Sequence, residues 1–246
     1  MRKQIVVGNW KLNGTKVLCQ QFASGLAGYI GSVELVICPP ATHIDCLVSA
    51  ASAHSSTVSV GGQNVAAQSG GPYTGEVSAG MLRELGACYA IVGHSERRAL
   101  FGETSEIVAQ KASHLLEAGI TPIICVGESS LVREGGEHAK FVGRQITEVL
   151  SRLAPSAESA VILAYEPIWA VGTGNTASSE QVQSMHAHIR SVAAPFINSV
   201  ATRVLYGGSV TPDNAANLLA LPDVDGALVG GASLELDKFL AVAGGC

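Results

Sequence analysis

The sequence predicts an α/β protein folded as a single-domain (β/α)8 barrel over residues 1–246. Short apolar, β-branched runs alternate eight times with longer segments of helical period. Hydrophobic residues make up 47% of the chain and charged residues 14%, which suits parallel strands buried on both faces. No Pro/Ser-rich or charged linker divides the chain, and eight repeats favour closure into a barrel over an open doubly wound sheet.

The expected strands are the short runs rich in Val, Ile and Leu. They are Gln4–Asn9, Glu34–Cys38, Thr57–Gln63, Cys88–Gly93, Thr121–Val126, Ala160–Tyr165, Arg203–Tyr206 and Gly226–Val229. A helix is expected after each strand, because apolar residues recur there at helical spacing. These helices are Lys16–Tyr29, His43–Ala53, Ala79–Leu85, Ser105–Ala118, Glu137–Leu153, Ser178–Ala193, Pro212–Leu219 and Ser233–Val242. The helix at 212 has a capping residue, Thr211, followed by proline at its first position.

One connection, residues 64–78, is too long for an ordinary loop between a strand and its helix. Structureless loops of this length are uncommon in compact domains and are often functional. A mobile surface excursion is one interpretation. Apolar residues and Tyr73 among the turn-forming glycines favour an interaction loop instead.

Composition excludes several classes of partner. The net charge is −5 with no basic run, so the sequence shows no electrostatic footprint for nucleic acid. No apolar run approaches the roughly 20 residues of a membrane span, and the apolar run near the N-terminus is too short for a signal peptide. The six cysteines are scattered without CxxC pairing, which indicates free thiols rather than disulfides or zinc. We expect a cytoplasmic protein with no nucleic acid or membrane partner.

Polar residues follow three of the expected strands at their C-terminal ends. Asn9 and Lys11 follow the first, His94 the fourth and Glu166 the sixth. In a barrel these ends converge on one face, where such enzymes keep their active sites. A Lys, a His and a Glu around one cavity make a plausible acid–base set. Taken singly, Lys11 could also be a surface charge, and a lone histidine is more often structural.

Glu166 is the candidate base. Apolar neighbours precede it, so we expect burial to raise the pKa of its carboxyl group. The segment after it, Pro167–Gly174, is apolar between proline and glycine ends, as in a lid that excludes water. A glutamate capping a strand in solvent is the alternative, and the following segment argues against it.

Two late glycine clusters indicate an anion site. They follow the seventh and eighth strands and contain Ser209 in one and Gly230 and Gly231 in the other. Glycines let backbone N–H groups approach an oxyanion, and loops in these positions often bind phosphate in barrels. Tight turns without a ligand are the alternative.

Two other motifs do not carry a function. The segment 172–177 matches G-x-G-x-x-A, but it does not turn directly off a strand and no acidic residue follows at the right distance. His186 and His188 are two positions apart, so they point to different faces of a helix and are poor metal partners.

Four segments together resemble the signature segments of the triosephosphate isomerase family, in its order and spacing. They read GNWKLNG (8–14), GHSERR (93–98), AYEPIWAVGTG (164–174) and YGGSV (206–210). The resemblance covers the whole chain and implies interconversion of dihydroxyacetone phosphate and glyceraldehyde 3-phosphate, as in glycolysis and gluconeogenesis, with no cofactor or metal.

The resemblance also implies a role for each site residue. Glu166 would move a proton between C1 and C2 through an enediolate. His94 would polarise the carbonyl group and shuttle protons between the two oxygens. Asn9 and Lys11 would stabilise the developing oxyanion, with Glu96 as a supporting residue. Backbone amides of Gly172, Ser209, Gly230 and Gly231 would hold the phosphate. The lid would comprise Pro167, Ile168, Trp169, Ala170, Val171, Gly172, Thr173 and Gly174. The loop of Tyr73, Thr74, Gly75 and Glu76 would insert into a second subunit of a homodimer.

Two other classes of function stay open at this point. One is an isomerase or lyase of another sugar phosphate on the same barrel. The other is a non-catalytic binding protein, which would be expected to have lost Lys11, His94 or Glu166.

Overall fold

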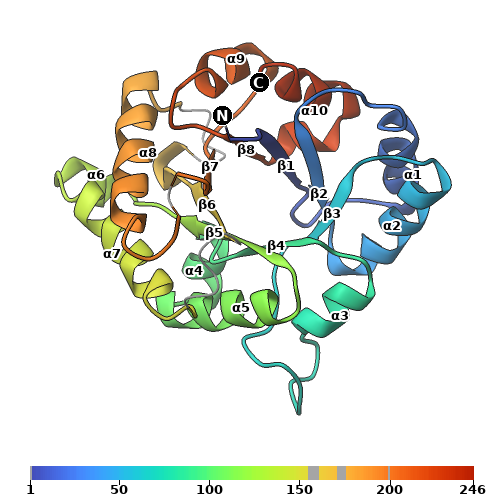
Figure 1. Cartoon of the computed structure of the whole chain (residues 1–246), viewed down its shortest axis with the longest axis horizontal. Coiled ribbons are helices and arrows are strands. Elements are labelled where there is room, and N and C mark those ends of the chain that lie inside the picture. Colours follow the sequence, from blue (N-terminus) through green and yellow to red (C-terminus); the bar gives the residue numbers. More distant parts are fainter. Residues whose placement is uncertain (1, 155–160, 171–175, 199) are drawn as a thin grey trace.

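The computed structural model describes residues 2–154, 161–170, 176–198 and 200–246. These residues form a closed barrel of parallel strands in chain order, with helices around it (Figure 1). The strands are β1 (Ile5–Asn9), β2 (Glu34–Cys38), β3 (Ser59–Gly62), β4 (Tyr89–Val92), β5 (Thr121–Val126), β6 (Ile162–Tyr165), β7 (Arg203–Tyr206) and β8 (Gly226–Val229). Ile5 of β1 lies opposite both Glu34 of β2 and Gly226 of β8, so β1 closes the sheet. The predicted barrel is confirmed.

The helices lie outside the strands. They are α1 (Lys16–Gly25), α2 (Ile44–Ala53), α3 (Ala79–Glu84), α4 (Ser95–Phe101), α5 (Ser105–Glu117), α6 (Ser130–Glu134), α7 (His138–Leu150), α8 (Ser179–Ala193), α9 (Pro212–Leu219) and α10 (Leu236–Ala243). Short 3₁₀ turns cover Ala41–His43, Ile168–Ala170 and Gly231–Leu234. None of the helices described is both long enough and apolar enough to cross a membrane.

Several predicted bounds were wrong in detail. The first helix ends at Gly25 rather than Tyr29, because the chain turns at Gly28, where φ is +74°. The last helix begins at Leu236, after a 3₁₀ turn, rather than at Ser233. The predicted strands from Thr57, Cys88 and Ala160 are shorter at one or both ends, and the helix after 137 ends three residues early. Position 160 lies outside the described residues.

Two short helices, α4 and α6, were not predicted. His94, two residues after the end of β4, is the N-cap of α4, and Gly102 with the left-handed φ of +67° follows its last residue. Its apolar residues Leu100 and Phe101 are exposed, so no buried stripe marks it in the sequence.

The strands separate two apolar cores. Alternate side chains such as Ile5 and Val7 of β1 point into the barrel, where they pack with those of the other strands. Val6 points outward, into the larger core between strands and helices. All three are fully buried. Burial on both faces keeps the backbone of each strand fixed, and with it the residues at its end.

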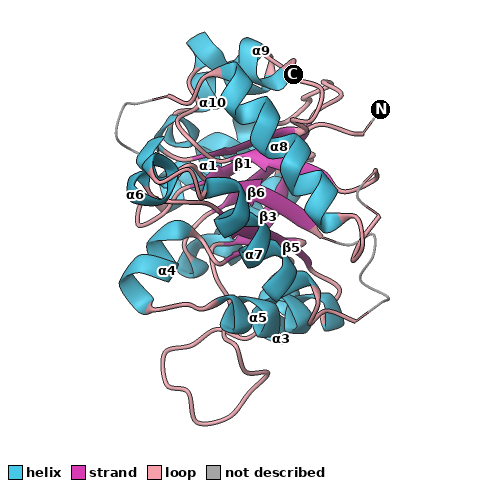
Figure 2. Ribbon diagram, turned by 90° about the vertical axis from the view of Figure 1, so that its left-hand side faces the viewer, coloured by secondary structure: helices cyan, strands magenta, loops and turns pink. Residues whose placement is uncertain are grey.

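The long loop between β3 and α3 projects away from the barrel, as the sequence predicted (Figures 1 and 2). A hydrogen bond from the N–H of Ala66 to the carbonyl of Val77 closes its base at 2.8 Å. At its tip, Tyr73 is 46% exposed although it is a large aromatic residue. The loop therefore has a fixed base, and among the described residues the aromatic ring of Tyr73 at its tip stays largely exposed.

Candidate active site

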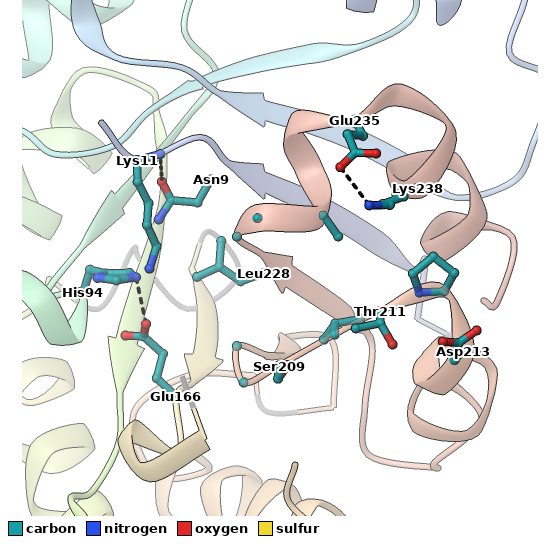
Figure 3. Close-up of a pocket in the computed structure, with 17 residues that line it drawn as sticks. Asn9, Lys11, His94, Glu166, Ser209, Thr211, Asp213, Leu228, Glu235 and Lys238 are labelled. Carbon is teal, nitrogen blue, oxygen red and sulfur yellow. Dashed lines mark hydrogen bonds and ion pairs between the residues drawn. The ribbon is translucent and has the colours of Figure 1, made fainter. Parts of the chain in front are cut away.

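A cavity of about 650 Å³ opens at the C-terminal ends of the strands (Figure 3). Asn9, Lys11, His94 and Glu166 line it, although they come from three different strand ends. The segments 207–213 and 230–232, with Leu228, Glu235 and Lys238, complete the described lining. The structure thus brings together the residues that the sequence placed at separate strand ends.

Glu166 is buried at the base of this cavity, with 1% of its surface exposed. The backbone N–H of Ser95 donates to its Oε2 at 2.9 Å, and the Ser95 hydroxyl donates to its Oε1 at 3.2 Å. Nε2 of His94 lies 2.9 Å from the same Oε1. A Cβ at Gly207 would come within 3.0 Å of the Glu166 side chain, so glycine leaves room for it there.

These contacts reverse the expected direction of the Glu166 pKa. Burial is the largest influence and raises the pKa, as the sequence suggested. The hydrogen bond and the electrostatic attraction of His94, with hydrogen bonds from Ser95 and Cys125, together outweigh it and hold the pKa of Glu166 below its usual value. The expectation of a raised pKa was wrong for this arrangement, because the apolar run before Glu166 does not reveal the donors that follow β4.

His94 is held in a defined orientation between two glutamates. The backbone N–H of Glu96 donates to Nδ1 of His94 at 3.2 Å, in the first turn of α4. A nitrogen that accepts a hydrogen bond carries no proton, so the proton of a neutral ring lies on Nε2. Nε2 faces Glu166 and the cavity, which makes it the hydrogen-bond donor of the ring.

Lys11 has an unusual backbone. Its φ is +51°, in the left-handed region that side-chain-bearing residues seldom adopt. Asn9 accepts from the Lys11 N–H at 3.1 Å through Oδ1, and Gln63 donates to the Lys11 carbonyl at 2.9 Å. Its ammonium lies 2.5 Å from Oε1 of Glu96. The surrounding residues therefore impose this conformation and direct the ammonium group over the cavity.

Glu128 anchors the first part of the segment expected to form a lid. Its Oε1 accepts from Tyr165 Oη at 3.0 Å and from Trp169 Nε1 at 2.9 Å. Arg133 donates to the same oxygen at 3.0 Å, and its guanidinium lies over the Trp169 ring at 4.9 Å. Glu128 is fully buried, so these donors offset the cost of burying its polar carboxyl group.

The two glycine clusters face the cavity from adjacent strands. Ser209 follows β7, and Gly230 and Gly231 follow β8. The Ser233 hydroxyl donates to the Gly230 carbonyl at 2.7 Å, and the buried indole of Trp10 donates to the Ser233 carbonyl at 2.9 Å. These two hydrogen bonds connect the second cluster to Trp10, the residue that follows β1.

The structure describes the first half of the expected lid. Pro167, Ile168, Trp169 and Ala170 are described. Val171, Gly172, Thr173 and Gly174, with the expected phosphate contact at Gly172, lie outside the described residues.

Sequence reasoning did not single out Ser95, Gln63 or Glu128. Ser95 stands inside the quoted segment 93–98, and Gln63 ends a predicted strand, so position offered a signal for both. Glu128 follows β5 with only Gly127 between, which is the same strand-end position as that of the other site residues. Its burial and its three donors became visible only in the fold.

The described residues contain no group of three His, Cys, Asp or Glu side chains placed to hold a metal ion. His186 is buried with Nδ1 3.2 Å from the carbonyl of Asp223, while Nε2 of His188 lies 2.8 Å from the carbonyl of Ala139.

Fold and site together define a class of protein, a (β/α)8-barrel enzyme with an acid–base site. Comparison with known proteins gives the family. The family model described as triosephosphate isomerase matches residues 4–246. The triosephosphate isomerase of Alcanivorax borkumensis is 49% identical over 98% of this chain and 97% of its own length. Those of Cupriavidus necator and Hydrogenovibrio crunogenus are 46% and 44% identical, over 98% of this chain and 99% and 97% of theirs. The chain belongs to the triosephosphate isomerase family.

Proposed function

We propose that this chain interconverts dihydroxyacetone phosphate and D-glyceraldehyde 3-phosphate, the isomerisation used in glycolysis and gluconeogenesis. One observation carries the proposal. Glu166, His94 and Lys11 line one cavity that also contains the two glycine clusters. A base, a hydrogen-bond donor, a cation and a candidate phosphate site are the groups that a proton transfer beside a carbonyl requires.

In the proposed reaction, Glu166 takes a proton from C1 of dihydroxyacetone phosphate. The C–H electrons form the C1–C2 double bond of an enediolate, and the carbonyl electrons move onto the oxygen at C2. Nε2–H of His94 donates to the oxygens, and the Lys11 ammonium and Asn9 stabilise the negative charge. His94 gives its Nε2 proton to the oxygen at C2 and takes the hydroxyl proton from the oxygen at C1, so its own proton is restored. The electrons of that O–H bond form the C1 carbonyl, the electrons of the C1–C2 double bond take the proton back from Glu166 at C2, and the aldehyde results.

Glu166 must leave its present partners to do this. Its carboxylate is held by Ser95 and His94, and a bound substrate offers His94 a new acceptor. Release from these donors removes the influences that lower the pKa, and closure of the lid removes water as well. Both changes favour a stronger base when substrate is bound.

The remaining roles are proposed on position. Glu96 orients Lys11 and His94 through its contacts with both. Backbone amides near Ser209, Gly230 and Gly231, with Gly172, hold the phosphate. Residues 167–174 close over it. The active form is a homodimer joined through Tyr73, Thr74, Gly75 and Glu76. Residues 1–246 form one domain. The enzyme acts in the cytoplasm.

An isotope experiment tests the reaction. The chain is incubated in D₂O with D-glyceraldehyde 3-phosphate, and products are followed by proton NMR beside a coupled dehydrogenase assay. The proposal expects dihydroxyacetone phosphate, part of it deuterated at C1 through exchange at the Glu166 carboxyl. No turnover of either triose phosphate by the folded protein would overturn it.

A further inference from the structure

The cavity extends beyond the residues given roles above. Its outer part lies between the start of α9 and the start of α10, where Pro212, Asp213, Glu235 and Lys238 line it (Figure 3). The proposed proton transfer uses none of these four. They line the same cavity as Glu166, so their charges act on a substrate that enters it.

The charges of this outer part are unevenly distributed. Asp213 and Glu235 are acidic, and Lys238 is the only basic residue on the outer lining that the structure describes. Further in, Lys11 is already paired with Glu96. The chain carries a net charge of −5, so an approaching phosphate dianion meets overall repulsion.

Lys238 is held at the mouth of the cavity without being buried. Its Nζ lies 2.8 Å from Oε1 of Glu235, one turn earlier, and its side chain is 52% exposed. Glu235 immediately precedes α10, and its side chain makes no capping hydrogen bond. The pair stabilises the first turn of α10 only modestly, and it holds the positive charge beside Glu235.

We propose that Lys238 attracts the substrate dianion into the cavity and that Glu235 weakens this attraction by pairing with it. The inference rests on the proposed function, because it assumes a phosphorylated substrate. The phosphate binds deeper, beside the glycine clusters, in the ground state and the transition state alike. Lys238 therefore contributes to kcat/KM and leaves kcat unchanged.

The test compares Lys238→Gln, Lys238→Arg and Glu235→Gln with the unaltered protein above about pH 7.5, where the phosphate is a dianion. Lys3→Gln is the matched control. Lys3 is also exposed, at 64%, but precedes β1 and so stands at the opposite end of the barrel. Unphosphorylated D-glyceraldehyde serves as the uncharged substrate.

At about 10 mM ionic strength, where screening extends about 30 Å, Lys238→Gln is expected to lower kcat/KM for the triose phosphate about two- to fourfold. Lys238→Arg retains the activity, and Glu235→Gln raises kcat/KM because it frees the ammonium group. At about 1 M salt, where the screening length is about 3 Å, these differences disappear.

Three results would overturn the inference. They are an unchanged kcat/KM in Lys238→Gln at low salt, an equal loss in Lys3→Gln, or an equal loss with D-glyceraldehyde. An unchanged kcat/KM would mean that Lys238 has no effect on substrate capture. An equal loss in Lys3→Gln would assign the loss of kcat/KM to net charge, and an equal loss with D-glyceraldehyde would assign it to a structural change. Failure of the proposed function looks different, because the unaltered protein itself would then not turn over triose phosphates.

Discussion

Nε2 of His94 lies 2.9 Å from Oε1 of Glu166, although the two residues follow β4 and β6, which are separated in the barrel by β5. The two side chains meet because both point toward the barrel axis, above the C-terminal end of β5. The acid–base partners are thus assembled by strand order, and the base is held by its neighbours when no substrate is bound.

Glu166→Gln should fold normally and lose most of its turnover. The amide keeps the shape of the carboxylate but cannot accept the proton, so we expect kcat to fall about 100- to 10,000-fold. Coupled assays give kcat, and thermal unfolding gives the stability. Glu137→Gln, the same change at an exposed position, should leave kcat intact. Turnover near that of the unaltered protein would refute the role of Glu166 as base.

Gln63→Ala should disturb Lys11 without touching the cavity. Gln63 donates to the carbonyls of Lys11 and Cys38, both at 2.9 Å, and so holds the left-handed backbone at Lys11. Leaving these acceptors unpaired should cost about 1–3 kcal/mol of unfolding free energy, and KM should rise as the ammonium group loses its position. Gln21→Ala, on the exposed side of α1, is the control. An unchanged KM would show that Gln63 is not needed to position Lys11.

Trp169→Phe and Tyr165→Phe each remove one donor from the Oε1 atom of Glu128. Both should lower the unfolding free energy by about 1–3 kcal/mol, since each leaves the buried Glu128 carboxyl group with one donor fewer. Only Trp169 belongs to the expected lid, so only its variant should also lower kcat. Denaturant unfolding and steady-state kinetics measure the two effects. If Trp169→Phe and Tyr165→Phe changed kcat equally, the contact between Trp169 and Glu128 would have no special role in the lid.

Acid should destabilise the fold through His186. Burial is the main cause that lowers the pKa of His186 from 6.5 to about 4. Below pH 6.5 the unfolded chain binds a proton there that the folded chain does not, so stability falls as the pH drops from 6.5 toward 4. At about pH 4.5 this loss amounts to about 2–3 kcal/mol.

Urea unfolding at about pH 7.5 and about pH 4.5, at one protein concentration, measures the effect. His186→Gln should lose correspondingly less stability between the two values than the unaltered protein, while His54→Gln, an exposed histidine, should match it. An identical pH dependence in all three would assign acid unfolding to other groups.

The protein should sediment as a dimer, with twice the chain mass of 25.2 kDa. Tyr73 at the loop tip is 46% exposed although it is aromatic, and Tyr73→Asp would place a charge in the contact that we expect there. Sedimentation equilibrium should show a shift toward monomer for this variant. Leu131→Asp alters a side chain that is 79% exposed on α6 and should leave the dimer intact. A fully active monomer of the unaltered protein would contradict the proposal.

The fold class was predictable because it depends on pattern. A short apolar run that is buried on both faces can be recognised from its own residues, and the strand Thr121–Val126 was predicted to the residue. Helices α4 and α6 escaped prediction because they are short and carry no buried stripe. These helices form because of the tertiary contacts of the segments on either side of them.

Residue type and spacing alone were enough to predict the barrel, the residues that follow its strands and the family resemblance, because a sequence records these features directly. The chemistry of those residues depends on the tertiary structure. The fold places Ser95 and His94 on Glu166 and so lowers a pKa that was expected to rise, and it joins Gln63 to Lys11. These contacts cross from one strand end to another. Only closure of the barrel brings such residues within hydrogen-bond distance.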